Sequence, residues 1–135
     1  MARDDRDYDY EIFSPAYLNE PESRPQNPVW MDTVPTLDPD FDAYVLEYGS
    51  GYTLQIDGLP LGQTLTKAVL MVPGSVTHHS DMHQRYVELV ADVSGGETIE
   101  FRTPTAETQA PPGLYMLFLI TNAPSVSHAI WVMLP

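Results

Sequence analysis

Short strand-like runs separated by turn signals are the feature that most limits how this chain can fold. The runs either alternate apolar and polar side chains or are apolar throughout, and no segment has the 3.6-residue period of a helix. Turn pairs such as Asp57-Gly58 and Pro73-Gly74 end two of them. The runs cover residues 44–48, 52–56, 67–72, 86–90, 98–102, 114–121 and 129–134. About seven short strands at this spacing predict an all-β, immunoglobulin-like β-sandwich.

Residues 1–42 differ from the rest of the chain because they are acidic, proline-rich and weakly periodic. Residues 10–13 could form one short strand, which Ser14-Pro15 would end. The prolines that follow keep the chain extended or turning. We therefore expect an extended N-terminal arm over 1–42 and a sandwich body over 43–135. The length of 135 residues suits one domain overall.

The formal net charge of −13 limits the partners of the chain. Such a surface repels nucleic-acid phosphates and anionic membranes, so we expect neither as a partner. A protein partner or a second copy of the chain remains, and basic protein surfaces are the natural targets of acidic ones. The first residues lack the apolar stretch of a signal peptide, which predicts a cytoplasmic protein or a part of an intracellularly assembled particle, with a piece of a longer, secreted parent as the open alternative.

A set of short segments appears in a recognisable order from about residue 10 onward. They are residues 11–18 (EIFSPAYL), 24–25 (RP), 48–49 (YG), 72–78 (VPGSVTH), 82–85 (MHQR), 110–118 (APPGLYMLF), 123–126 (APSV) and 131–132 (WV). In this order and spacing they resemble the C-terminal, early set domain of the galactose oxidase and glyoxal oxidase-like family. The resemblance implies an immunoglobulin-like fold for this chain.

The same resemblance implies a role near copper. In such oxidases a propeller domain carries most of a copper radical site, and the C-terminal domain sends one loop into it and supplies one histidine. The residue that matches this ligand is His78. The chain has no propeller and no cysteine, and one histidine cannot complete the mixed nitrogen and oxygen site that copper prefers. We expect no enzyme activity and no cofactor for the chain alone, and copper only together with a partner domain.

Three histidines lie close together around this loop: His78, His79 and His83. Their spacing fits no standard zinc pattern, so they are either part of a shared metal site or a solvated polar loop. The alternating Asp38, Asp40 and Asp42 superficially resemble a calcium loop. However, Ala43 and Gly49 stand where that loop needs a glycine and a glutamate, which favours an acidic surface turn.

Aromatic side chains gather in the first half of the sequence. Tyr10, Phe13, Tyr17 and Trp30 are the candidate interaction residues, because aromatic side chains commonly anchor interfaces. For Trp30, packing within the domain is an equal alternative. The tyrosines at 44, 48 and 52 are expected to pack in the core or across strands.

These observations support three functions of different classes. The first, slightly favoured, is a non-catalytic interaction or structural module whose arm docks on a larger assembly, such as a viral or cellular shell, a fibre or an enzyme complex. The second is a detached C-terminal domain of a copper radical oxidase that supplies His78. The third and weakest is a carbohydrate-binding module, which would need a line of exposed aromatic side chains.

Overall fold

The computed structural model describes residues 27–73, 76–77, 80–81, 85–94, 96–123 and 125–135, and it contains strands and no helix in these ranges. No helix that could cross a membrane is therefore found among them. The strands are β1 (Val29–Met31), β2 (Thr36–Asp38), β3 (Ala43–Val45), β4 (Gly51–Gln55), β5 (Leu65–Met71), β6 (Val76–Thr77), β7 (Ser80–Asp81), β8 (Tyr86–Glu88), β9 (Val90–Ser94), β10 (Thr98–Arg102), β11 (Gly113–Thr121) and β12 (Ile130–Leu134).

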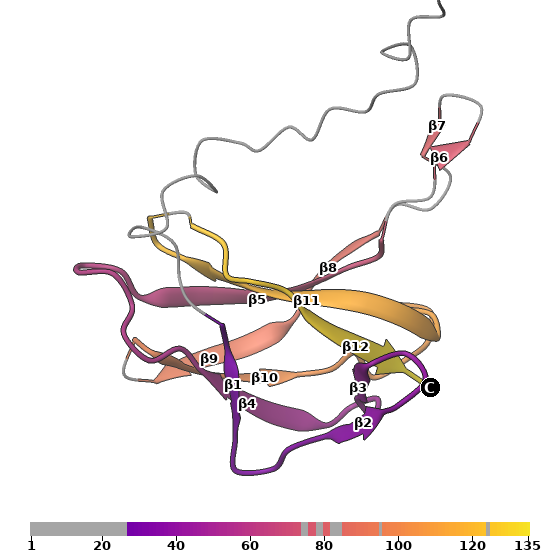
Figure 1. The fold of residues 1–135 in the computed structure, drawn as a ribbon, viewed down its shortest axis with the longest axis horizontal. Coiled ribbons are helices and arrows are strands. Elements are labelled where there is room, and N and C mark those ends of the chain that lie inside the picture. The colour runs from indigo at the N-terminus through magenta and orange to yellow at the C-terminus, as the bar shows by residue number, and fades with distance from the viewer. Residues whose placement is uncertain (1–26, 74–75, 78–79, 82–84, 95, 124) are drawn as a thin grey trace, which may run out of the picture.

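Two sheets packed face to face form the body of the protein (Figure 1). One sheet has the strand order β1-β4-β10-β9, and the other has the order β2-β3-β12-β11-β5-β8. A separate pair, β6 and β7, forms a small hairpin. Neighbouring strands run antiparallel in every recorded pair except β3 and β12, which are parallel. The predicted all-β sandwich is confirmed.

The predicted run 86–90 is divided in the structure. Residues 86–88 form β8 at one edge of the six-stranded sheet, and β9 begins at Val90 on the edge of the other sheet. Between them, the buried Leu89 donates its N–H to the carbonyl of Ala68 at 2.9 Å. The chain thus changes sheets at a single residue. The other predicted runs each coincide with one strand, within a few residues at their ends.

Two strands lie within the segment expected to be an extended arm. β1 pairs with β4, and β2 pairs with β3, so residues 29–38 contribute to both sheets. Pro28 and Pro35 each come directly before one of these strands. Because proline cannot donate to a ladder, it is tolerated before a strand and at sheet edges, and β1 and β2 are both edge strands. Strands of three residues are too short to show an alternating pattern.

Trp30 links β1 to the hydrophobic core and is 9% exposed. Its ring meets Tyr44 and Tyr52 edge-on, with centroid distances of 5.4 and 6.0 Å, and lies 6.3 Å from Phe101. Edge-to-face pairs at such distances add to the stabilisation from burial. The indole N–H has no acceptor among the described residues, so part of this gain is offset.

Two tyrosine hydroxyls hold the turn that precedes β11. Tyr48 donates to the carbonyl of Ala110 at 2.7 Å, and Tyr115 donates to the carbonyl of Pro111 at 2.6 Å. Loss of contact with water raises the pKa of both phenols above the usual value. The nearby Glu107 carboxylate raises the pKa of Tyr48 further. Folding therefore favours the protonated, donating form of both groups.

We predict that Trp30→Ala lowers the free energy of unfolding by about 3–5 kcal/mol, because it empties a large site in the core. Urea denaturation followed by circular dichroism measures this change. Trp30→Phe should cost clearly less, since it keeps an aromatic ring and removes the N–H that lacks an acceptor. Trp131→Ala is the control at a half-exposed tryptophan and should change stability by about 0.5 kcal/mol or less. Equal losses for the two alanine variants would contradict this view of the core.

We predict that Tyr115→Phe costs about 1 kcal/mol at neutral pH through the lost hydrogen bond. Because the pKa of Tyr115 is raised by folding, its contribution is complete below about pH 10 and is lost as the pH rises through the folded-state pKa. We expect the free energy of unfolding, measured with urea, to fall less between about pH 8 and about pH 11 in Tyr115→Phe than in the parent. Tyr86→Phe, at an exposed tyrosine, should decline like the parent. Identical declines in all three proteins would refute the proposed linkage.

Candidate functional site

The β6–β7 hairpin is the most distinctive part of the molecule outside the two sheets. The ladder between β5 and β8 ends with Met71 opposite Tyr86, and Val72 then donates its N–H to the carbonyl of Arg85 at 3.1 Å. The hairpin pairs Val76 with Asp81 at its start. Figure 1 shows it standing beyond the six-stranded sheet, on the side away from the four-stranded sheet. The hairpin therefore leaves the sandwich from a hydrogen-bonded base.

Several predicted site residues fall on parts of the chain outside the described residues. His78, predicted as a copper ligand, follows β6 directly in sequence, His79 comes next, and His83 follows β7 in sequence. Tyr10, Phe13 and Tyr17, predicted to mediate an interaction, belong to residues 1–26, which also lie outside the described part of the chain. All of these assignments stay predictions.

Arg85 anchors the base of the hairpin to the neighbouring turn. Its Nη1 donates to the carbonyl of Gln109 at 3.4 Å, and the side chain of Gln109 accepts the N–H of Thr105 at 3.1 Å. Burial is the stronger influence on the nearby Tyr115 and raises its pKa, whereas the positive charge of Arg85 acts in the opposite direction. The sequence motif contains Arg85, but nothing in the motif predicted this contact with Gln109.

The structure also locates two other predicted groups. Trp30 lies in the core, so it packs within the domain, and an interface role for it stays a prediction. Asp38 accepts the N–H of Asp40 through Oδ1 at 2.9 Å and the N–H of Phe41 at 3.4 Å. The carboxylate is used to build an exposed turn, as the surface-turn interpretation expected. Within the described ranges, no three histidine or acidic side chains gather in a way that could hold a metal ion.

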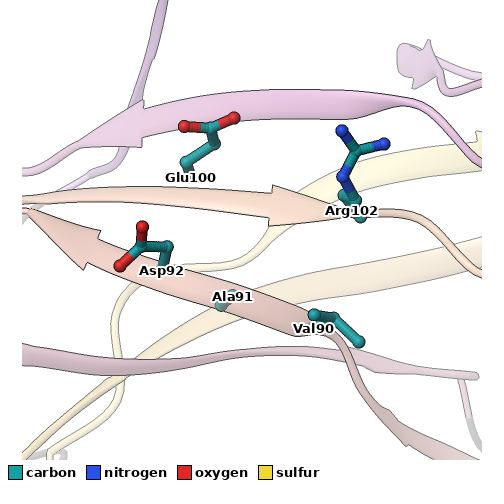
Figure 2. A pocket seen from close by; sticks show the side chains of 5 residues that line it. All are labelled: Val90, Ala91, Asp92, Glu100 and Arg102. Atoms are coloured by element: carbon teal, nitrogen blue, oxygen red, sulfur yellow. The ribbon is translucent and has the colours of Figure 1, made fainter.

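A hollow on the four-stranded sheet brings three charged side chains near one another. Figure 2 shows Asp92 and Glu100 on the neighbouring strands β9 and β10, with Arg102 further along β10. Asp92 and Glu100 stand directly opposite each other in the register. Their like charges repel and cost stability at this position. All three side chains are exposed on an open sheet face, which does not exclude water as an acid–base site requires. We therefore assign no catalytic role to this hollow.

Comparisons with known proteins agree with the geometry. Residues 35–134 match the family model for the galactose oxidase-like, early set domain. A galactose oxidase of Gibberella zeae (strain ATCC MYA-4620 / CBS 123657 / FGSC 9075 / NRRL 31084 / PH-1) is 30% identical over 127 residues. A second Gibberella zeae galactose oxidase is 29% identical over 127 residues. Each alignment covers 93% of this chain and 17% of the relative.

A solved structure supports the same fold. It is described as a novel fungal alcohol oxidase with catalytic diversity among the AA5 family, in complex with copper. The two structures are similar with a TM-score of 0.58 at 20% identity, over 80% of this chain and 20% of that one. The family expected from the sequence motifs is confirmed, since its model matches most of the sandwich. This chain belongs to the galactose oxidase-like, early set domain family.

Proposed function

We propose that this chain is the non-catalytic sandwich module of a copper-dependent oxidase and that it works docked on a larger catalytic domain. The observation that carries this proposal is the β6–β7 hairpin, which stands out from a sandwich of the galactose oxidase-like family. The hairpin carries His78 in its sequence, the residue that matches the copper-ligand histidine of such oxidases. The chain spans 17% of the length of its galactose oxidase relatives, so most of such a protein would be the partner.

The donor groups of the chain support a dependent role. One imidazole can supply one ligand, whereas copper needs several nitrogen or oxygen donors in a defined geometry. The sequence has no cysteine to provide a thiolate or a thioether crosslink. Bound in a completed site, copper would supply the redox chemistry. The contribution of this chain would be to hold one imidazole in position from a hydrogen-bonded base.

The alternative, docking on a larger assembly through residues 1–42, stays a prediction. Three of its candidate interaction residues, Tyr10, Phe13 and Tyr17, lie outside the described part of the chain. Light scattering of the full chain separates the two ideas. A large, concentration-dependent assembly that is indifferent to Cu²⁺ would favour the assembly role. A monomer would favour the accessory module.

We predict that a chimera restores copper binding. The C-terminal segment of the Gibberella zeae galactose oxidase that matches this chain is replaced by this chain, and the copper retained after dialysis is measured. The chimera should retain copper, while the same oxidase without a C-terminal domain should not. His78→Ala in the chimera should lower copper affinity at least about tenfold, since even groups that only support metal ligands cost about 10- to 100-fold when removed.

His128→Ala is the matched control, because His128 is an exposed histidine that precedes β12 in sequence and is not part of the hairpin. Thermal unfolding of both variants checks that each chimera is folded. A folded His78→Ala chimera with the copper affinity of the parent would show that His78 is no ligand. A folded parent chimera without copper would remove the basis of the proposal.

A further inference from the structure

The outer faces of the two sheets differ in chemistry. In the central strands β4 and β10 of the four-stranded sheet, the side chains that alternate with the buried ones are polar. They are Thr53, Gln55, Thr98, Glu100 and Arg102. This is the ordinary arrangement of a sandwich, with one face of each sheet in water. Its exposed apolar side chains, such as Met31 and Val90, lie on the edge strands β1 and β9.

The central strands of the six-stranded sheet lack that alternation. In β11 the inward side chains Tyr115, Leu117 and Leu119 are buried in the core. The outward positions between them are also apolar, namely Leu114, Met116, Phe118 and Ile120, and they are half-buried. A strand that is apolar on both sides is typical of a sheet covered on both faces.

One row of side chains crosses this outer face from strand to strand. The register places Trp131 of β12 opposite Met116 of β11, Met116 opposite Met71 of β5, and Met71 opposite Tyr86 of β8. Trp131, Met71 and Tyr86 are 41%, 38% and 54% exposed. We call these four residues the methionine–aromatic row. Tryptophan, tyrosine and methionine are the residue types enriched where proteins bind one another.

The row and the hairpin share one side of the molecule. Tyr86 begins β8, directly after the hairpin returns to the sheet at Arg85. The hairpin stands beyond this same sheet, away from the four-stranded one (Figure 1). A partner that covers the row must therefore also accommodate a projecting hairpin beside it. A large domain with a recess meets this requirement, whereas a second copy of the chain would bring a projecting hairpin of its own to the contact.

We propose that the methionine–aromatic row is the surface on which the catalytic domain of the oxidase docks. This inference rests on the proposed function and adds where the contact is made. Methionine and aromatic side chains supply apolar, adaptable contact area. The exposed ion pair of Lys67 with Glu88, at 3.8 Å, lies on the neighbouring strands and forms a polar rim. The partner surface is accordingly apolar at its centre.

The test compares two double variants of the full chain. The row variant is Trp131→Ser with Met71→Ser. The control variant is Met31→Ser with Val90→Ser, at 37% and 77% exposure on the outer face of the four-stranded sheet. As isolated chains, both should melt within about 2 °C of the parent, because exposed side chains contribute little to folding. If the melting temperature of the row variant alone fell by more than this, the row would belong to the core, and the proposal would be overturned.

Both doubles are then placed in the galactose oxidase chimera described above. The row variant should increase the rate of proteolytic cleavage between the two parts at least about tenfold, which is typical of losing a central tryptophan contact. The control variant should leave that rate unchanged. Equal rates for the two variants, in a parent chimera that holds copper, would overturn the docking surface and leave the proposed function intact. A parent chimera that never holds copper counts against the proposed function itself.

Two further measurements identify other occupants of the row. If the isolated parent forms dimers in light scattering and the row variant does not, a second copy covers the row. If acrylamide quenching of Trp131 rises after residues 1–26 are removed, the N-terminal segment of the chain covers it. The Trp131→Phe variant assigns the signal, since Trp30 is the other tryptophan. Either result would overturn the proposal, whereas a quenchable Trp131 in a monomeric parent supports it.

Discussion

Strand β11 makes the packing contacts on which the whole sandwich depends. It pairs with β12 on one side and with β5 on the other, and its inward side chains enter the core against the facing sheet. Burying one large apolar side chain stabilises the fold by about 1.5–3 kcal/mol. The sequence has no cysteine, so no disulfide assists. The strand ladders therefore hold each sheet together, and apolar burial holds the two sheets against each other.

The same strand is one reason for proposing that this chain works docked on a larger domain. Its outward side chains are apolar, so the six-stranded sheet has no polar surface over its centre. At Leu89 the chain passes from β8, at the edge of the six-stranded sheet, to β9, at the edge of the four-stranded sheet. This passage follows soon after Arg85, where the hairpin returns to the sandwich. A rigid sheet with an apolar face and a hairpin at its edge can position a side chain for a partner.

Much of the fold could be predicted from local patterns. Alternation and turn pairs located the strands from β3 to β12, apart from the short hairpin strands and β9, and the ordered motifs identified the family. β1 and β2 were missed because they lie in a segment with prolines at 28, 35 and 39, where no alternating run is long enough to read. The start of β9 at Val90 was missed because residues 86–90 alternate like one strand, and only contacts with two different sheets separate β8 from β9. The histidine site came from family resemblance, and its residues stay predictions.

By itself, the sequence determined the strand class, the positions of most strands, the acidic charge and the family, because these depend on local order and composition. The tertiary structure decided which strands are neighbours and which side chains stand opposite one another. Trp131, Met116, Met71 and Tyr86 come from four separate segments and become one row through register alone. Register depends on contacts between residues distant in sequence, and a shift by one residue would turn each side chain to the other face. No local pattern contains that information.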